Sequence, residues 1–329
     1  MRIAVLGCGS IGKRHLRNLL AEGTHELIPF DPNADARAHV EKVLNLKTAS
    51  SLDEVWQMQP RAAIVSAPPD CHLELALQAA RHGVHLFVEK PVADRSEGTE
   101  RLVELVRRGR LISLVGCNMR FHPGPATVKT LLKQNAIGAI LAARIQTGSY
   151  LPDWRPSTDY RRSYTASRAQ GGGAILDCIH ELDLALWYFG PASVAAALAL
   201  PAEKLGIEVE GLAEILLNHS SGIVSSVHLS FLQRDYRRLC QIIGETGTIY
   251  WDFESPWIEI RGATGTERRI ELDASWNVNQ MYVDEIRHFL QCIERQEPTC
   301  CPLEQGIAAL KVALRARELA LGVSSKARI

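Results

Sequence analysis

A six-residue glycine loop near the start of the chain constrains its fold more than any other feature. The loop Gly7-Cys8-Gly9-Ser10-Ile11-Gly12 follows a short apolar run at 2–6 and precedes a helix-like segment at 13–22. A strand, such a loop and a helix in this order are typical of a dinucleotide-binding βαβ unit. There the first glycine permits a tight turn, the second lets the backbone approach a pyrophosphate, and the third lets the helix pack on the strand. Because free N–H groups at the helix start favour phosphate, we expect dinucleotide contacts from Gly7, Gly9, Ser10, Ile11 and Gly12.

An acidic residue follows the second predicted strand. Residues 26–30 form an apolar run that ends at Asp31, 19 residues beyond Gly12. A carboxylate about 20 residues after the loop takes the ribose hydroxyls of NAD and repels the 2′-phosphate of NADP. We therefore expect NAD as the cofactor, while Arg37, which is close in sequence, keeps NADP open. The alternative is that Asp31 only caps the helix that follows Pro32.

The first 120 residues continue as alternating strands and helices. Apolar runs at 62–66, 84–88 and 111–115 are separated by segments of helical character. This alternation predicts a parallel, doubly wound sheet, and hence a dinucleotide-binding Rossmann domain over residues 1–120. Ligands of such sheets bind at the carboxyl ends of the strands. The further cofactor contacts that we expect at these ends are Ser66, Ala67, Pro68, His72, Glu89, Lys90, Asn118 and Arg120.

The strand at 84–88 ends in Glu89-Lys90-Pro91. Two charges in this place also suit a strand that simply leaves the core for solvent. Pro91, however, favours an extended Lys90 and is compatible with a cis bond. A lysine held at the cofactor edge can donate a proton or a hydrogen bond to a hydroxyl or carbonyl oxygen, and burial favours the neutral amine. We therefore expect Lys90 to be catalytic.

The segment 173–190 has the spacing of an amphipathic helix with polar side chains set into its apolar face. Asp177 and His180 are three residues apart and would share one face of that helix, as would His180 and Asp183. Imidazole titrates near neutral pH and suits proton transfer. The alternative is that these groups only form hydrogen bonds inside a core. Beside the glycine loop, the pattern predicts that Asp177 and His180 are catalytic and contact the substrate.

Five motifs together resemble the glucose–fructose oxidoreductase / inositol dehydrogenase / MocA (Gfo/Idh/MocA) family. They are GCGSIGKRH (7–15), SAPPDCH (66–72), VHLFVEKPVA (84–93), GCNMRFHP (116–123) and GGGAILDCIHELD (171–183), with weaker matches at 244–253 and 281–293. The resemblance covers nearly the whole chain in the right order. It implies that Lys90, Asp177 and His180 flank the substrate. One departure is that many members place the aspartate four residues before the histidine, whereas Asp177 lies three before His180.

From residue 121 the pattern changes, and we place a second, α+β domain at 121–329. Strand-like segments follow in quick succession at 193–200, 208–219, 222–232, 236–243, 247–253, 256–261 and 267–272, and two helix-like segments follow at 278–295 and 303–321. Strands without intervening helices predict a large, open, mainly antiparallel sheet. The family resemblance implies that a homodimer or homotetramer forms through this sheet.

The segment 151–169, just before the predicted central helix, is rich in arginine and aromatic residues. The planar guanidinium of arginine suits a carboxylate or phosphate, so we expect an anionic substrate. A solvated loop is the alternative. The sequence LPDWRPSTDYRRSY (151–164) also resembles the family branch found in surface-polysaccharide and nonulosonate sugar pathways. The substrate contacts expected here, besides Lys90, Asp177 and His180, are Arg155, Tyr160 and Tyr164.

Composition excludes several other classes. Thirty-seven basic residues balance thirty-seven acidic ones, so no overall field draws the chain to nucleic acid or to an anionic membrane. No apolar run approaches the roughly 20 residues of a membrane span, and the start of the chain lacks a signal-peptide pattern. The eight cysteines show neither CxxC nor Cys/His ligand spacing. We therefore expect no metal site, no disulfide framework and a cytoplasmic protein.

These observations predict an NAD-dependent oxidoreductase that transfers a hydride between nicotinamide and a ring hydroxyl or keto carbon of a sugar, sugar acid or sugar nucleotide. His180 or Lys90 would move the hydroxyl proton while the other polarises the oxygen, and Asp177 would orient His180 or bind a neighbouring hydroxyl. A different class is a non-catalytic, dinucleotide-sensing regulatory protein of the same fold. A third alternative is a cofactor that stays bound and recycles while one sugar is oxidised and another reduced.

Overall fold

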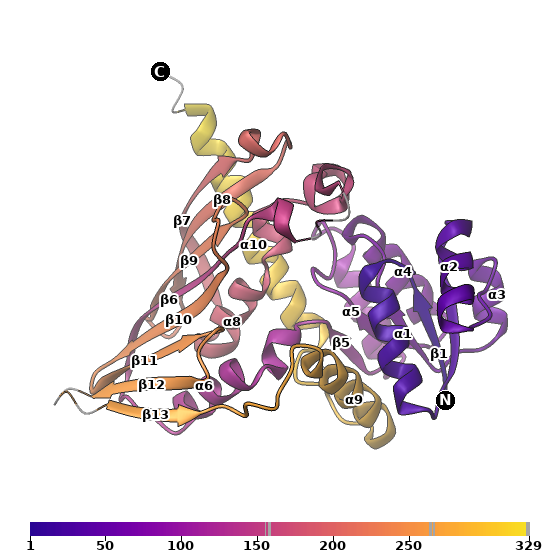
Figure 1. Cartoon of the computed structure of the whole chain (residues 1–329), viewed down its shortest axis with the longest axis horizontal. Helices are drawn as coiled ribbons and strands as arrows, with labels where there is room; N and C mark the ends of the chain where they lie inside the picture. Colours follow the sequence, from indigo (N-terminus) through magenta and orange to yellow (C-terminus); the bar gives the residue numbers. More distant parts are fainter. Residues whose placement is uncertain (155, 157–158, 263–264, 266, 327–329) are drawn as a thin grey trace. The chain divides into compact units, whose positions relative to one another are not determined.

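The chain forms two compact units in the computed structural model, which describes residues 1–154, 156, 159–262, 265 and 267–326 (Figure 1). The first unit is Met1–Asn118 with Val278–Ile307, and the second is Met119–Asn277 with Ala308–Ile329. The sequence places residues 278–307 in the second domain, whereas the contacts assign them to the first unit. Among the described residues, no helix combines the length and the hydropathy that a membrane-spanning segment requires.

The first unit is built on a five-stranded parallel sheet in the order β2-β1-β3-β4-β5. Its strands are fully apolar or nearly so, and they are buried because helices flank a sheet of this kind. This confirms the predicted doubly wound fold. The strands are β1 (Arg2–Leu6), β2 (Glu26–Phe30), β3 (Ala62–Val65), β4 (His85–Val88) and β5 (Ser113–Val115), and the helices are α1 (Ser10–Glu22), α2 (Ala34–Leu44), α3 (Leu52–Gln57), α4 (Pro69–Arg81), α5 (Thr99–Arg108) and α9 (Gln280–Arg295).

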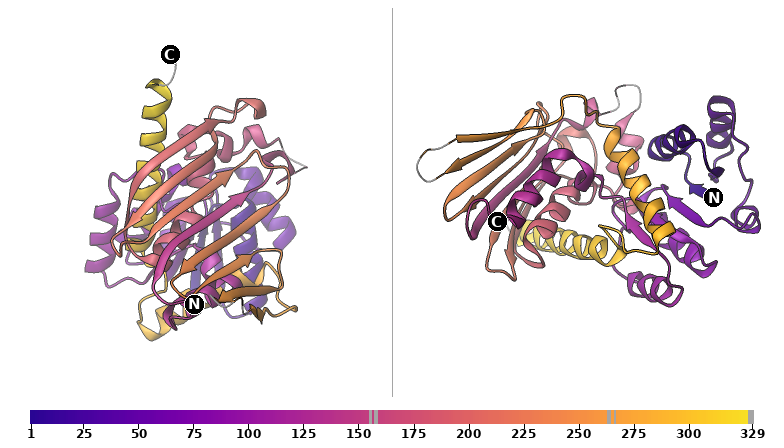
Figure 2. Two further views of the ribbon diagram at one scale, coloured as in Figure 1. Left: turned by 90° about the vertical axis from the view of Figure 1, so that its left-hand side faces the viewer. Right: turned by 90° about the horizontal axis from the view of Figure 1, so that it is seen from below.

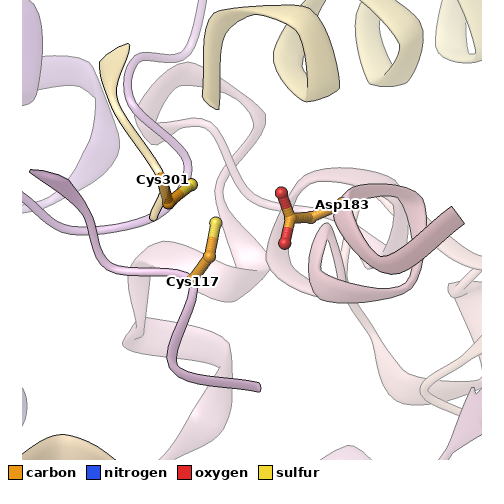
Figure 3. Close-up of side chains that lie close together, drawn as sticks. All are labelled: Cys117, Asp183 and Cys301. Atoms are coloured by element: carbon orange, nitrogen blue, oxygen red, sulfur yellow. The ribbon is translucent and has the colours of Figure 1, made fainter. Parts of the chain in front are cut away.

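Helix α9 belongs to the first unit because it packs along α1. Asn279, at its N-cap, donates to the side-chain oxygen of Asn18 at 2.9 Å, and Arg287 forms an ion pair with Glu22 at 2.7 Å. The following loop continues the contact, since the N–H of Val115 donates to the carbonyl of Cys301. The thiol sulfurs of Cys117 and Cys301 also lie within 4.8 Å of each other in this unit (Figure 3).

The second unit contains an eight-stranded sheet in the order β13-β12-β11-β10-β6-β9-β8-β7. Only the β6–β9 pair among these neighbours is parallel, which confirms the predicted large and mainly antiparallel sheet. The strands are β6 (Ile140–Gly148), β7 (Ala192–Pro201), β8 (Glu210–His219), β9 (Val224–Ser230), β10 (Arg237–Gly244), β11 (Gly247–Asp252), β12 (Trp257–Gly262) and β13 (Glu267–Glu271).

Helices cover one face of this sheet and leave the other open (Figure 2). The covering helices are α6 (Pro123–Lys133), α7 (Ala174–Asp177) and α8 (His180–Phe189), and α10 (Leu303–Lys326) begins in the first unit and ends in the second. On the open face, Leu198, Leu200, Leu216 and Val224 are each 41–58% exposed on the adjacent strands β7, β8 and β9. This face therefore carries an uncovered apolar surface.

The prediction of one amphipathic helix over 173–190 is wrong in two respects. The segment forms two helices, α7 and α8, because the backbone of Cys178 leaves the helical region at ψ 33°. It is also buried on every side from Ala174 to Ala185. Its polar residues Asp177, His180 and Asp183 are all enclosed, and Asp183 is ion-paired with Arg120.

The segment 151–169 forms a series of short 3-10 turns instead of a longer element. They are η2 (Leu151–Asp153), η3 (Tyr160–Arg162), η4 (Tyr164–Ala166) and η5 (Arg168–Gln170), while η1 (Asn118–Phe121) and η6 (Glu203–Leu205) lie elsewhere in the chain. The glycines that follow allow close packing. A Cβ at Gly172 would lie 2.3 Å from the carbonyl oxygen of Tyr164, so the turn series is held directly against the start of α7.

Candidate active site

The glycine loop between β1 and α1 has the shape that a dinucleotide requires. Gly7 adopts φ +109°, and a Cβ there would lie 2.6 Å from the carbonyl of Ser66. A Cβ at Gly12 would lie 1.9 Å from the carbonyl oxygen of Gly7, so the helix must approach the strand this closely. At Gly9, no atom of the described residues lies within 4 Å of the corresponding position. The loop is thus tight beneath its first and third glycines and open above the second, where a pyrophosphate would approach.

The start of α1 is free of side-chain capping. Gly9 is the N-cap and supplies no side chain, and Ser10 is exposed. The first N–H groups of a helix lack partners within the helix and attract anions. Together with the open space at Gly9, this arrangement fits the phosphates of NAD. The contacts of Gly7, Gly9, Ser10, Ile11 and Gly12 with a cofactor remain a proposal.

Asp31 lies immediately after β2 and beside the glycine loop. Its Oδ2 accepts a hydrogen bond from the N–H of Cys8 at 2.8 Å, and its Oδ1 accepts from the N–H of Asn33 at 2.9 Å. The cap of α2 is the side chain of Asn33, so the interpretation of Asp31 as that cap is wrong. Arg37 donates to the carbonyl oxygen of Asp31 at 2.7 Å. The carboxylate is therefore fixed beside the glycine loop, and its contact with the ribose hydroxyls of a dinucleotide stays a prediction.

His72 on α4 connects two of the loops predicted to bind the cofactor. It is fully enclosed, with Nδ1 2.7 Å from the carbonyl oxygen of Pro91 and Nε2 2.6 Å from that of Ala67. Burial lowers the pKa of this imidazole, and the two carbonyl oxygens oppose that shift. The hydroxyl of Ser66 is also engaged, since it donates to the carbonyl of Gly7 at 3.0 Å. These contacts show His72 and Ser66 as links between loops, and their expected contacts with the cofactor, like those of Ala67 and Pro68, stay predictions.

Lys90 follows β4 and is half-buried, and the Lys90–Pro91 bond is cis. Its backbone N–H donates to Oε2 of Glu89 at 3.3 Å. The other oxygen of Glu89 lies 2.6 Å from Nε2 of His15, which comes from α1. Glu89 therefore connects the lysine backbone to the first helix of the fold, and a direct cofactor contact of Glu89 or Lys90 stays a prediction.

A second acidic residue, Glu285, which the sequence analysis missed, lies beside the pair of His15 and Glu89. Polar atoms of His15, Glu89 and Glu285 lie within 4.8 Å of one another, and all three residues are buried. Burial raises the pKa of Glu285 well above its usual value, and the charge of Glu89 raises it further. A signal was present in the sequence. Glu285 stands four residues from both Met281 and Phe289, on the apolar face of α9.

In the second unit, Asp177 ends α7 and is held by two hydroxyl groups. Its Oδ1 accepts from the phenol of Tyr164 at 2.9 Å, and its Oδ2 accepts from Thr165 at 2.8 Å. The aspartate thus fixes η4 to the end of α7. Thr165 is a contact that the sequence analysis missed, because nothing in the spacing of a single threonine identifies it.

His180 begins α8 and is 7% exposed. Since the helix breaks before it, His180 and Asp177 belong to different helices, and the i, i+3 argument that paired them does not hold. Asp183, which the sequence pairs with His180, has Arg120 as its partner: its two oxygens accept hydrogen bonds from that guanidinium at 2.6 and 2.9 Å. Glu181 similarly accepts from Arg238 at 2.7 Å.

The remaining predicted site residues have mixed positions. Asn118 and Arg120 are buried in η1, and the guanidinium of Arg120 forms an ion pair with Asp183, so cofactor contacts from this turn stay predictions. The phenol of Tyr160 donates to the carbonyl of Leu205 at 2.9 Å. Arg155 lies outside the described residues. Of the other arginines in this segment, Arg161 is exposed and paired with Asp159.

Two family models match this chain. The first, described as an oxidoreductase family with an NAD-binding Rossmann fold, matches residues 1–117, and the second, the Gfo/Idh/MocA C-terminal domain, matches residues 126–250. The chain belongs to the Gfo/Idh/MocA family. As a member of that family it is an oxidoreductase with an NAD-binding domain, which confirms the predicted family and cofactor class.

Named relatives of this family member span most of its length. An inositol 2-dehydrogenase from Burkholderia multivorans is 26% identical over 94% of this chain and 90% of its own. A levoglucosan dehydrogenase solved in complex with NADH has a TM-score of 0.88 at 18% identity, covering 98% of this chain and 97% of that one. A UDP-N-acetylglucosamine 3-dehydrogenase from Acidithiobacillus ferrooxidans has a TM-score of 0.82 at 23% identity, with 98% of each chain covered. At these identities the solved structures show a shared fold and nothing more.

Proposed function

We propose that this protein is an NAD(H)-dependent dehydrogenase or reductase that acts on a ring hydroxyl or keto carbon of a sugar, sugar acid or sugar nucleotide. The observation that carries the proposal is the glycine loop, which is open at Gly9 and bordered by the fixed carboxylate of Asp31. Its supporting context is the set of relatives, which are named as dehydrogenases of inositol, levoglucosan and UDP-N-acetylglucosamine.

NAD is the proposed cofactor in preference to NADP. The glycine loop and the start of α1 would hold the pyrophosphate, and Asp31 would accept hydrogen bonds from the ribose hydroxyls. A 2′-phosphate would place negative charge against that carboxylate. Arg37 does not offset this repulsion freely, because it already donates to the backbone carbonyls of Asp31 and Pro32. When bound, the nicotinamide supplies the hydride chemistry.

Lys90 and His180 are the proposed proton-transfer groups. One of them takes or returns the proton of the substrate hydroxyl, and the other donates a hydrogen bond to the same oxygen. Both oxygens of Asp177 accept hydrogen bonds, one from Tyr164 and the other from Thr165. A carboxylate oxygen accepts more than one hydrogen bond, so Asp177 still has capacity to orient His180 or to bind a neighbouring hydroxyl.

The test is a substrate screen with the purified protein. NAD⁺ and NADP⁺ are each combined with myo-inositol, scyllo-inositol, levoglucosan, UDP-N-acetylglucosamine and a hexuronic acid, and NADH or NADPH formation is followed by absorbance. Turnover with at least one of these substrates and a preference for NAD⁺ support the proposal. Binding of NAD(H) without turnover in either direction would favour the dinucleotide-sensing alternative. A role in surface-polysaccharide synthesis rests on the 151–164 segment alone and requires turnover of the sugar nucleotide.

The open face of the eight-stranded sheet is the proposed association surface of a homodimer or homotetramer. Leu198, Leu216 and Val224 lie on three neighbouring strands, and their side chains are 41–58% exposed. Covering them would remove apolar surface from water. Light scattering of the wild type and of Leu216→Lys measures this directly: we expect an oligomer for the first and a smaller species for the second, with the exposed Val43→Lys of the first unit as the control. A wild-type monomer at micromolar concentration would contradict it.

A further inference from the structure

The buried cluster of His15, Glu89 and Glu285 in the first unit has an unusual charge composition. His15 and Glu285 are 0% exposed and Glu89 is 7% exposed. The three residues come from α1, from the end of β4 and from α9, so three separate elements bring them together. The cluster adjoins Lys90, because Glu89 is the preceding residue and accepts a hydrogen bond from the backbone N–H of Lys90.

The hydrogen bonds of the cluster are incomplete in a specific way. Nε2 of His15 lies 2.6 Å from Oε1 of Glu89, whereas Nδ1 of His15 has no hydrogen-bond partner among the residues that the structure describes. Neither carboxyl oxygen of Glu285 has a hydrogen-bond partner within the described part of the chain. If Nε2 carries the ring proton and donates to Glu89, then Nδ1 is an acceptor. A protonated Glu285 is a donor, so the two groups without partners are chemically complementary.

The charges around Glu285 do not support a second buried anion. Glu89 and Cys301 both disfavour its ionised form, and Arg14 favours it. The guanidinium of Arg14 lies 4.3 Å from the ring centre of Tyr282, a half-buried residue on which the charges of Glu89 and Lys90 also act. Within the described part of the chain, neither oxygen of Glu285 accepts a hydrogen bond from this arginine. Two carboxylates in one buried site ionise in separate steps, and the second step is strongly disfavoured.

We propose that His15, Glu89 and Glu285 hold one proton between the two carboxylates at neutral pH. The protonated Glu285 then limits the negative charge of the cluster next to Lys90 to one. Its role toward Lys90 rests on the proposed function. The proton resides on Glu285, Nε2 of His15 donates to Glu89, and Glu89 remains the anion. A second negative charge here would favour the ammonium form of Lys90 and oppose its use as a base. His15 and Glu285 are therefore positioning residues.

The shared proton is tested first by stability, without cofactor or substrate. Because the pKa of Glu285 is raised in the folded state, the folded protein binds more protons than the unfolded chain. Stability from this group is therefore fully present below the unfolded pKa of about 4.3 and is lost as pH rises through the folded pKa. Glu285→Gln imitates the protonated acid and lacks this loss. The folding equilibrium constant of the variant should gain about tenfold on the wild type for each pH unit in this window.

Matched measurements keep this first test decisive. Glu294→Gln, which changes an exposed glutamate on the same helix, should follow the wild type at every pH. Infrared spectra of the unmodified protein at neutral pH should show a protonated carboxyl stretch that is missing from Glu285→Gln. A constant stability gap between pH 5 and 8, or no such stretch, would overturn the shared proton. So would a rise in melting temperature of the wild type, but not of Glu285→Gln, on addition of Zn²⁺ or Mn²⁺, since the three side chains would then be metal ligands.

The effect on Lys90 is tested by the pH profile of kcat in the oxidation direction. Glu89→Gln removes the anion, so the midpoint should move to lower pH by about one unit, the size expected for one close charge. Glu285→Gln should leave the midpoint at the wild-type position, because the residue it replaces is already neutral. If Glu285→Gln moves the midpoint as Glu89→Gln does, Glu285 is an anion and the inference is wrong. If Lys90 does not set the midpoint of these pH profiles, its proposed catalytic role is wrong. The stability test still decides whether the proton is shared.

Discussion

The two units differ in the partners of their buried carboxylates. In the second unit, Asp183, Glu181 and Glu210 each form an ion pair with a guanidinium, supplied by Arg120, Arg238 and Arg317. In the first unit, Glu285 is completely enclosed, and none of the described residues forms a hydrogen bond with either of its oxygens. A paired carboxylate is held in one charge state, whereas an unpaired one responds to pH. The difference separates groups that fix the fold from groups that are able to handle protons.

The ion pairs of the second unit connect segments that are distant in sequence. Arg317 on α10 donates to Glu210 and to the carbonyl of Gly172, and Glu210 in turn faces the N–H of Ile175 at the start of α7. Arg120 holds η1 against α8 in the same manner. The helices that carry Asp177 and His180 are thus fixed by buried charge pairs, which suits groups that must keep one orientation.

The largest effect should come from breaking one of these pairs. Arg120→Met leaves Asp183 buried without its partner, which destabilises a protein by about 3–5 kcal/mol. Urea unfolding followed by tryptophan fluorescence measures the change. The double variant Arg120→Met/Asp183→Leu should recover much of the loss, because no unpaired charge then remains. A loss below about 1 kcal/mol in the single variant would show that the two units do not differ as described.

The next effect concerns catalysis in the first unit. Lys90→Ala should lower kcat by about 10²-fold or more, the contribution of a proton-transfer group, while the melting shift caused by NADH stays near that of the wild type. Lys90→Arg should not restore turnover, because a guanidinium does not release its proton. The exposed Lys42→Ala on α2 is the control. Turnover within a few-fold of the wild type in Lys90→Ala would make the lysine purely structural.

A smaller effect is expected for a change of Asp31, whose carboxylate accepts hydrogen bonds from two backbone N–H groups. Asp31→Ala removes hydrogen bonds to the ribose and the repulsion of a 2′-phosphate, so the preference for NADH over NADPH should narrow by about tenfold or more. Isothermal titration with both dinucleotides gives the ratio. Asp35→Ala, on the exposed first turn of α2, should leave it unchanged. The assignment to NAD would be falsified if the wild type bound NADPH as tightly as NADH.

Local pattern was enough to predict much of this molecule. The strand–glycine loop–helix order predicts the Rossmann sheet, and the strand segments of the second unit fall within two or three residues of their observed bounds. The contacts that define the candidate site were not predictable, because they join residues that share no local pattern. Glu210 and Arg317 are 107 residues apart, and Glu89 lies 74 residues from His15. The break between α7 and α8 was missed for the same reason, since tertiary packing and not helix propensity decides it.

The smallest expected effect compares two phenols in the turn series before α7. Tyr164 donates to the carboxylate of Asp177, whereas Tyr160 donates to the neutral carbonyl of Leu205. Hydrogen bonds to charged groups contribute about 1.5–3 kcal/mol and neutral ones about 0.5–1.5 kcal/mol. Tyr164→Phe should therefore lose about 1 kcal/mol more than Tyr160→Phe in urea unfolding. Thr165 still donates to Asp177 in the Tyr164→Phe variant. The double variant Tyr164→Phe/Thr165→Val should therefore lose more stability than the two single changes added together, because the carboxylate then keeps neither hydroxyl donor. Equal losses for the two tyrosines would mean that Asp177 does not depend on this phenol, and the comparison between a fixed and a responsive carboxylate would then rest on the arginine pairs alone.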